Sequence, residues 1–264
     1  SKNVTNSHAG AILSIDLGAL TSNYHFLTKK LGGRKPSAVI KADGYGLGAL
    51  PIAITLANAG CQIFFVANLE EGIRLRNGLN ETEVSEYSDI EIHVLSGLMS
   101  NTEDVYEVSR LIPVLGSLNQ IYDWKVYCQR NNEALPCDIH VDTGISRLGL
   151  PPVELAILEI DPSRIESLNI SLIISHLACA DKPDHTKNKE QLIAFNHVRK
   201  VLPQGRASLA NSSGIFLGTD YHFDLARPGA ALYGLEPITD QANPMAQVVI
   251  LQGKIAQIRD IDTP

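Results

Sequence analysis

The chain has 264 residues, of which 44% are hydrophobic and 19% charged, so it is long enough to bury one large core. No apolar run reaches the roughly 18 to 20 residues that a membrane-spanning helix needs, and the polar first ten residues do not resemble a secretory signal. A net charge of −7 without a long basic stretch argues against nucleic acid as a partner.

The cysteines are widely spaced and include no Cys-x-x-Cys pair. They are Cys61, Cys128, Cys137 and Cys179. Scattered cysteines in a long chain rich in core residues are typical of buried, reduced thiols. The pattern therefore predicts a cytoplasmic protein, and the lack of a long apolar run predicts no membrane partner.

Short apolar or β-branched runs alternate with longer segments of helical spacing along most of the chain. The predicted strands are 37–40, 63–66, 92–95, 112–115, 137–141, 168–174 and 207–209, with an eighth near Phe223. The predicted helices are 50–59, 69–77, 118–131, 153–160 and 189–202, with Asn68 and Ser117 as caps ahead of two of them. Continuous apolar strands that alternate with helices indicate a parallel sheet. About eight of them favour an α/β fold of the (β/α)8 barrel type over an open, doubly wound sheet.

The end of the chain has a different pattern. Residues 246–261 combine an apolar run with alternation at period two, which is typical of antiparallel strands. Residues 236–244 carry two prolines and read as a linker. We therefore expect a barrel over 11–240 and the start of a truncated β-rich second domain over 245–264, to which 11–16 could also contribute a strand.

The first candidate site follows the first predicted barrel strand, in the segment VIKADGYGLG of residues 39–48. Lys41 comes directly after the strand, and barrels build their active sites at the carboxyl ends of strands. A partly buried lysine readily loses its proton and can then form a Schiff base. The glycines of the segment would allow a close approach of the backbone to a ligand. Taken alone, Lys41 could equally be a solvated lysine at a glycine-rich turn.

This segment resembles the cofactor-lysine motif of the alanine racemase family, and further similar segments follow in the family's order from about Ala11 to Asp262. The resemblance implies a barrel domain that binds pyridoxal 5'-phosphate. It also implies that Lys41 carries the cofactor covalently and that Tyr45 hydrogen-bonds the cofactor's phosphate.

A second family-like segment is HVDTGISRLGL of residues 140–150. The resemblance implies that Arg147 reaches toward the substrate carboxylate and the phenolic oxygen of the cofactor, which suits a planar, permanently charged guanidinium. From the residues alone, Arg147 could instead form a structural ion pair with Asp142. Many relatives have a lysine that can be carbamylated where this chain has His140. Because histidine cannot form that carbamate, an anion or a direct hydrogen bond is left to hold Arg147.

A third segment, ISHLACAD of residues 174–181, contains His176 at a strand end. A histidine in such a place is more often structural than catalytic, and the resemblance implies that His176 packs against the pyridine ring. The nearby pair Asp184 and His185 lacks further metal ligands and is predicted to lie in a surface loop, so we expect no metal site.

The last segments lie where barrels often bind phosphate, in the late loops beside a helix start. Taken alone, they read as a helix cap and a turn. The resemblance assigns Asn211, Ser212, Gly229, Ala230 and Tyr233 to the cofactor site, with Ser212, Gly229 and Ala230 at the phosphate. It places Arg227 against the pyridine nitrogen. An arginine does not release its proton, so the nitrogen would stay unprotonated and the ring would be a weaker electron sink, which favours racemisation over transamination.

The resemblance therefore implies a racemase that interconverts L-alanine and D-alanine for a bacterial cell wall. Lys41 would be one base, and the second would be a tyrosine of the partner subunit in a homodimer, beyond Pro264. A fragment without that tyrosine would be impaired. Serine or a broader range of amino acids remains open as substrate.

Three rival hypotheses share the barrel. One is a non-catalytic pyridoxal-phosphate carrier, one is a decarboxylase of the same fold, and one is a cofactor-free aldolase that uses the lysine directly. The lysine motif favours the racemase over the first two, and the phosphate segments count against the aldolase.

Overall fold

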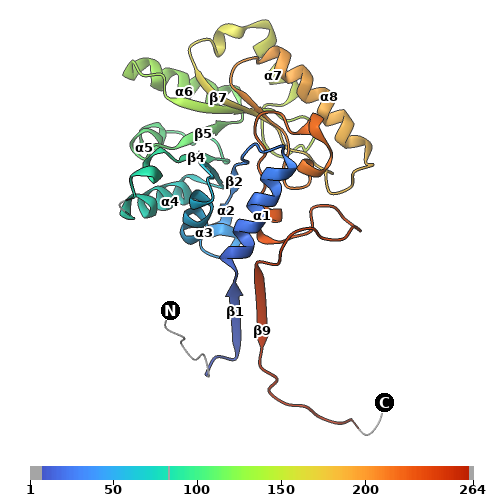
Figure 1. The fold of residues 1–264 in the computed structure, drawn as a ribbon. Coiled ribbons are helices and arrows are strands. Elements are labelled where there is room, and N and C mark those ends of the chain that lie inside the picture. The colour runs from blue at the N-terminus through green and yellow to red at the C-terminus, as the bar shows by residue number, and fades with distance from the viewer. Residues whose placement is uncertain (1–7, 83, 262–264) are drawn as a thin grey trace.

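The computed structural model describes residues 8–82 and 84–261. Its main body is a curled parallel sheet enclosed by helices, and a two-stranded ribbon extends from it (Figure 1). The sheet runs in the order β2-β3-β4-β5-β6-β7-β8, so each strand pairs with the next one along the chain. Its strands are β2 (Ala38–Val39), β3 (Ile63–Val66), β4 (Glu91–Val94), β5 (Ile112–Leu115), β6 (Pro136–His140), β7 (Asn169–Ile174) and β8 (Arg206–Ser208).

Helices follow the strands. They are α1 (Leu17–Lys30), α2 (Lys41–Tyr45), α3 (Ala49–Asn58), α4 (Leu69–Glu81), α5 (Glu103–Val108), α6 (Leu118–Asn131), α7 (Pro152–Ile160) and α8 (Thr186–Val201). All but the short α2, which lies at the carboxyl end of β2, cover the outside of the sheet (Figure 1). The predicted caps are confirmed, since the side chains of Asn68 and Ser117 accept hydrogen bonds from the backbone of Glu71 and Gln120. The alternating pattern therefore predicted the barrel-type fold correctly, although α1, α2 and α5 were not predicted.

The barrel closes through an irregular segment rather than through the eighth strand predicted near Phe223. Leu225 and Arg227 donate backbone hydrogen bonds to Ala207 and Ala210 on one side of this segment. On the other side, Ser37 and Val39 donate to Ala226 and Pro228. Phe223 has a positive φ of 47° and Pro228 has no N–H, so a regular ladder cannot run through 223–228.

The two faces of the sheet bury different sets of side chains, because neighbouring residues of a strand point to opposite sides. Phe64, Val66, Ile92, Val94, Ile139 and Ile173 belong to the large core shared with the helices. A smaller cluster fills the inside of the barrel, with Val39, Phe65, Val114, Leu172, Ile174 and Leu225.

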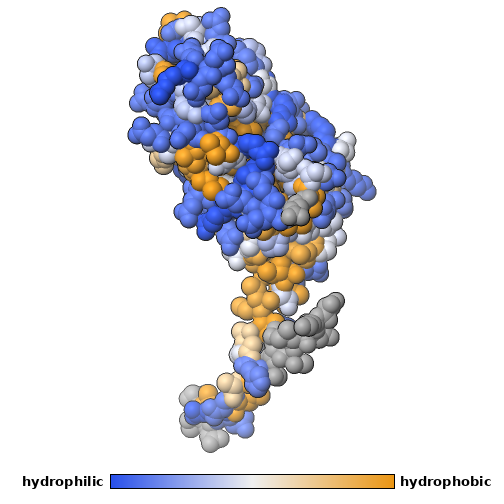
Figure 2. All heavy atoms as spheres, turned by 90° about the vertical axis from the view of Figure 1, so that its left-hand side faces the viewer, coloured by the Kyte–Doolittle hydropathy of each residue, from blue (hydrophilic) through white to orange (hydrophobic). Residues whose placement is uncertain are grey.

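The ribbon consists of β1 (Ala11–Ile15) and β9 (Val249–Gly253), which pair antiparallel. The prediction of antiparallel strands at the end of the chain is thus confirmed for 249–253. Several of its apolar side chains are exposed, including Leu13, Ile250 and Leu251. Figure 2 shows this apolar surface where the ribbon leaves the barrel. The division into two domains stays a prediction.

Among residues 8–82 and 84–261, no helix combines the length and the apolar character that crossing a membrane would require.

Candidate functional site

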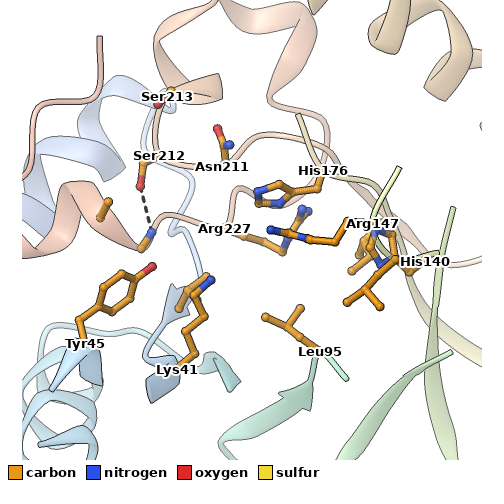
Figure 3. A pocket seen from close by; sticks show the side chains of 15 residues that line it. Lys41, Tyr45, Leu95, His140, Arg147, His176, Asn211, Ser212, Ser213 and Arg227 are labelled. Atoms are coloured by element: carbon orange, nitrogen blue, oxygen red, sulfur yellow. Dashed lines mark hydrogen bonds between the residues drawn. The ribbon is translucent and has the colours of Figure 1, made fainter. Parts of the chain in front are cut away.

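A cavity opens at the carboxyl ends of the barrel strands, as barrels generally arrange their sites. Figure 3 shows Lys41 and Tyr45 on one side, His140 and Arg147 on the other, and Arg227 and His176 between them. The full lining is Val39, Lys41, Tyr45, Leu95, His140, Arg147, Leu148, Ile174, His176, Asn211, Ser212, Ser213, Arg227, Gly229 and Ala230.

The charge of this cavity is one-sided. Lys41, Arg147 and Arg227 contribute three cations, whereas none of the described residues in the lining carries a carboxylate. The chain as a whole has a net charge of −7, so the positive cavity is a local feature. Clustered cations in a partly enclosed cleft attract an anionic ligand.

Lys41 is held at the start of an unusual backbone turn. Ala42, Asp43, Gly44 and Tyr45 all have φ between 52° and 63°, so α2 is left-handed rather than an ordinary helix. Left-handed backbone is unfavourable for residues with a Cβ and tends to occur where function requires it. The turn directs the side chains of Lys41 and Tyr45 into the cavity (Figure 3).

The glycines of this motif have a role that was not predicted. Gly44, Gly46 and Gly48 have φ of 63°, 82° and 95°, which glycine adopts without strain. None of them lines the cavity. They allow the left-handed turn, and the close approach of their backbone to a ligand stays a prediction.

Two carboxylates outside the cavity stabilise this turn. Glu71 accepts hydrogen bonds from the backbone of Ala42 at 3.1 Å and of Ala67 at 2.8 Å, and so ties the turn to the end of β3. Asp43 accepts from the backbone of Ala49 at 2.8 Å. In the sequence, Glu71 is simply one residue of the predicted helix 69–77, and nothing there signals its role in the turn.

Tyr45 lies between a glycine and a second tyrosine. A Cβ on Gly229 would overlap the Tyr45 hydroxyl, so only glycine fits at position 229 with this placement of the ring. On its other side, Tyr45 packs on Tyr233 with ring centroids 4.5 Å apart. Tyr233 is not in the lining of the cavity, and its hydroxyl faces the backbone oxygen of Val39 at 3.4 Å. It therefore contacts the site through Tyr45.

Ser212 organises the loop opposite Tyr45. Its Oγ accepts hydrogen bonds from the backbone of Gly229 at 3.0 Å and of Ala231 at 3.1 Å (Figure 3 shows the first). Asn211 accepts from the backbone of Gly214 at 2.8 Å and so shapes the same loop. Ala230 completes this wall of the cavity. The wall offers hydroxyl and backbone groups of the kind that bind phosphate.

Arg227 is anchored inside the barrel and is only 4% exposed. Its Nη1 donates to the backbone oxygen of Ser208 at 2.8 Å and to the Ser208 hydroxyl, and its Nη2 donates to the backbone oxygen of Ser175. These bonds fix the plane of the guanidinium at the floor of the cavity.

Arg147 is carried by a loop that Asp142 shapes. One carboxylate oxygen of Asp142 accepts from the backbone of Gly144, Ile145 and Ser146 at 2.8–3.1 Å. Among the ion pairs of the described residues, none joins Asp142 to Arg147. Asp142 therefore shapes the loop instead of neutralising the arginine, and Arg147 keeps its charge available in the cavity.

The two histidines of the cavity are neutral at physiological pH. Burial, followed by the charge of Arg227, lowers the pKa of His140 to about 4. Burial and then the charges of Arg227 and Arg147 lower the pKa of His176 to about 3. Nε2 of His140 is buried without a hydrogen-bond partner.

All the predicted site residues except Tyr233 lie in the lining of this one cavity. The lining also includes residues that the sequence analysis did not assign to the site: Val39, Leu95, Leu148, Ile174 and Ser213. Their apolar or small side chains give no chemical signal in a sequence. Asp184 and His185 are exposed and lie in the loop before α8, as predicted, and His185 also caps α8 by accepting a hydrogen bond from the backbone of Lys187.

The fold and the cavity define a class of protein: a (β/α)8-type barrel whose cationic ligand site, with a lysine at its first strand, lies at the carboxyl ends of the strands. The profile of the family described as "Alanine racemase, N-terminal domain" matches residues 15–237. The chain belongs to this family.

Relatives of the chain carry the same description. It is 47% identical over 259 residues to a catabolic alanine racemase of Mesorhizobium japonicum and 47% identical over 257 residues to an alanine racemase of Rhodospirillum rubrum. These matches cover 98% and 97% of this chain but 66% and 67% of the two relatives, so the chain spans about two thirds of their length.

Solved structures agree with the fold. The alanine racemase of Bartonella henselae, described with covalently bound pyridoxal phosphate, has a TM-score of 0.88 and 42% identity, over 96% of this chain and 69% of that one. The alanine racemase of Streptomyces coelicolor has a TM-score of 0.84 and 27% identity, over 96% of this chain and 68% of that one.

Proposed function

We propose that this chain is the barrel part of a pyridoxal-phosphate-dependent alanine racemase. The observation that carries the proposal is the placement of Lys41 with Arg147 and Arg227 in a cavity whose described lining has no carboxylate. Such a cavity suits a phosphorylated cofactor together with an amino acid carboxylate. Membership of the family supports the same activity.

The residues of the cavity fit this cofactor. The phosphate would lie against Ser212, Gly229, Ala230 and the hydroxyl of Tyr45, and Gly229 leaves the room that this hydroxyl occupies. Asn211 holds this loop in shape and Tyr233 supports the ring of Tyr45. His176, neutral because its pKa is lowered to about 3, would pack on the face of the pyridine ring without adding charge.

The cofactor, when bound, supplies an electron sink that makes the Cα proton of an amino acid acidic. Arg227 sets how strong that sink is. Its guanidinium is fixed by three hydrogen bonds and would donate to the pyridine nitrogen, which then stays unprotonated. A weaker sink favours return of the proton to Cα, as racemisation requires.

Lys41 is the covalent anchor and one of the two bases. Its Nζ would take the proton from Cα of D-alanine and return a proton to the same face. Arg147 binds the substrate carboxylate and fixes which face of Cα points toward Lys41. Neutral His140 borders the cavity beside Arg147, and we propose that it holds this arginine without a carbamate.

The second base would be a tyrosine outside these 264 residues, contributed by the partner subunit of a homodimer. Tyr45 is the tyrosine among the described residues of the lining, and it faces the phosphate wall. The apolar ribbon of β1 and β9 would then belong to a second, β-rich domain. The four free cysteines of the chain fit a cytoplasmic protein.

The test uses the cofactor-loaded chain with L-alanine and, separately, with D-alanine in heavy water. Deuterium at Cα and the chirality of the product are followed together, and the visible absorption of the bound cofactor shows that the site is folded. Exchange of D-alanine without conversion is the expected result, since Lys41 is the proposed base in this cavity and the second base is proposed to lie on the partner subunit. Full racemisation would contradict the assignment of the second base. The absence of exchange from either enantiomer, with the absorption intact, would favour a non-catalytic carrier.

A further inference from the structure

The inside of the barrel contains ionisable groups directly below the cavity. Barrel interiors are usually filled by bulky aliphatic side chains. Here His93 and Asp138, both fully buried, lie among the apolar residues of the inner cluster. The strand register places His93 beside Phe65 and places Asp138 between Val114 and Leu172. Because burying charges is costly, this pair calls for an explanation beyond packing.

His93 and Asp138 form the centre of a column of charges. Nδ1 of His93 lies 2.6 Å from a carboxylate oxygen of Asp138, and Nε2 of His93 lies 3.3 Å from Glu91. Glu91 in turn is paired with Arg206 at 3.1 Å, and both of these side chains are partly exposed. The column thus runs from solvent into the middle of the barrel.

Arg227 is the next charged group above this column. Its guanidinium carbon lies 6.0 Å from the centroid of the Phe65 ring, and Phe65 stacks on His93 with centroids 4.7 Å apart. All the hydrogen-bond acceptors of Arg227 among the described residues, on Ser208 and Ser175, are neutral. A buried guanidinium without a counter-charge is unfavourable. The second carboxylate oxygen of Asp138 is buried and has no hydrogen-bond partner.

We propose that Asp138, held in place by His93, is a positioning residue for Arg227: its buried carboxylate is the counter-charge that keeps the guanidinium charged and fixed at the floor of the cavity. The inference rests on the proposed function, in which Arg227 faces the pyridine nitrogen of the cofactor. It adds a residue that acts on the cofactor through Arg227 without touching it.

Burial raises the pKa of Asp138, and the charge and hydrogen bond of His93 oppose that rise and favour the ionised carboxylate. Burial lowers the pKa of Arg227 to about 10, and the charge of Asp138 opposes that effect. Burial also lowers the pKa of His93, but the charges and hydrogen bonds of Asp138 and Glu91 outweigh it and raise the pKa to about 9. His93 is therefore protonated at neutral pH. Arg206 adds a further positive charge at the open end, and His140, two residues after Asp138 on β6, is neutral.

The test compares Asp138→Asn with one control variant and with a variant of its partner His93, all in the cofactor-loaded protein. Asp138→Asn keeps the shape of the side chain and removes its charge. Leu172→Val alters a neighbour of Asp138 in the same inner cluster without changing charge, and His93→Gln removes the imidazolium but leaves the carboxylate. Each variant is measured by hydrogen exchange of the Arg227 guanidinium in NMR spectra and by its affinity for pyridoxal phosphate.

We expect Asp138→Asn to speed exchange at Arg227 and to weaken cofactor binding, each by roughly tenfold, the scale seen when a partner that orients a metal ligand is removed. The absorption of the bound cofactor should also change its pH dependence. Leu172→Val should leave exchange at Arg227 within about twofold of the wild-type rate. His93→Gln removes the partner that holds Asp138 in place, so it should speed exchange at Arg227 in the same direction as Asp138→Asn. Equal effects of all three variants, or none for Asp138→Asn, would overturn the proposal and leave the pair a structural one.

A measurement on the wild-type protein keeps the proposal testable should Asp138→Asn fail to fold. The carbon chemical shift of the Asp138 carboxyl group should show an ionised carboxylate at neutral pH, and a protonated carboxyl group would mean that Asp138 lacks the required charge. These NMR readings do not need the cofactor. A wild-type chain that does not bind the cofactor would therefore contradict the proposed function separately.

Discussion

The outer and inner faces of the barrel sheet use opposite chemistry although they belong to the same strands. On β3, Phe64 points outward into the core shared with the helices, whereas Phe65 points inward beside His93 and Arg227. The outer face is apolar throughout the strands. The inner face combines an apolar cluster with buried charges and leads upward into a cationic cavity. The outer face therefore sets the stability of the fold, and the inner face sets what the protein binds.

The largest effect expected on the inner face comes from Lys41→Ala. The change removes both the covalent anchor and one base, and general acid–base catalysis alone contributes about 10²- to 10⁴-fold to a rate. Exchange of the Cα proton of D-alanine should fall by at least that factor, while thermal unfolding stays close to that of the wild type. Lys35→Ala, which changes a lysine outside the cavity, is the control. Normal exchange in Lys41→Ala would show that another group is the base.

Arg147→Lys should have the next largest effect. The lysine keeps the charge but loses the planar fork that binds a carboxylate through two hydrogen bonds. Because hydrogen bonds to charged groups contribute about 1.5–3 kcal/mol, the apparent affinity for alanine should fall by about 10- to 100-fold. Cofactor absorption should be retained. An unchanged dependence of Cα exchange on the concentration of D-alanine would remove Arg147 from the substrate site.

The two phenylalanines of β3 offer the sharpest test of the contrast between the faces. Both are fully buried, so Phe64→Leu and Phe65→Leu should each cost about 1 kcal/mol of unfolding free energy. Only Phe65→Leu should also alter cofactor affinity, because its ring lies between His93 and Arg227. Denaturant unfolding gives the unfolding free energy of both variants, and titration with the cofactor gives their affinities. Equal cofactor affinity in the two would contradict the division of roles.

The smallest effects expected are on the pH dependence of the unfolding free energy. The effect of the two cavity histidines, His140 and His176, should have the opposite sign to that of His93 below the cavity. The folded-state pKa values of His140 and His176 lie at about 4 and about 3, below the ordinary value near 6.5. Their contribution to the free energy of unfolding is complete above pH 6.5 and is lost as the pH falls through these folded-state pKa values. For His93, with a folded pKa of about 9, the contribution is complete below pH 6.5 and is lost as the pH rises through 9.

Two variants separate the acid side of this pH dependence from its alkaline side. His176→Gln should flatten the acid side of a plot of melting temperature against pH, and His93→Gln should flatten the alkaline side. The two changes interfere little because the residues lie at different levels of the barrel. If both variants changed the same side of the curve, the protonation states would be assigned wrongly.

The sequence predicted the outer face well because that face depends on hydrophobic pattern alone. The strands at 63–66 and 112–115 and the helix at 118–131 were located correctly. The closure of the barrel was not located correctly. Residues 224–228 bond to the chain around β8 on one side and around β2 on the other without a regular strand pattern.

The inner face was harder to predict. Lys41, Arg147 and Arg227 were found through a family resemblance, since a charged residue after a strand has no distinctive pattern. Glu71, which holds the turn after Lys41, and the buried pair of His93 and Asp138 were missed. Their roles depend on contacts between residues 29 and 45 positions apart in the chain, which local patterns do not reveal.

The account depends most directly on Lys41 as the residue that carries the cofactor. The cofactor-loaded protein would be treated with borohydride, which makes the covalent link between a lysine and the cofactor's aldehyde permanent, and its peptides would be analysed by mass spectrometry. The account predicts that the label lies on the peptide that contains Lys41 and on no other lysine. A label on another residue, or a folded protein that binds the cofactor without any covalent label, would contradict it.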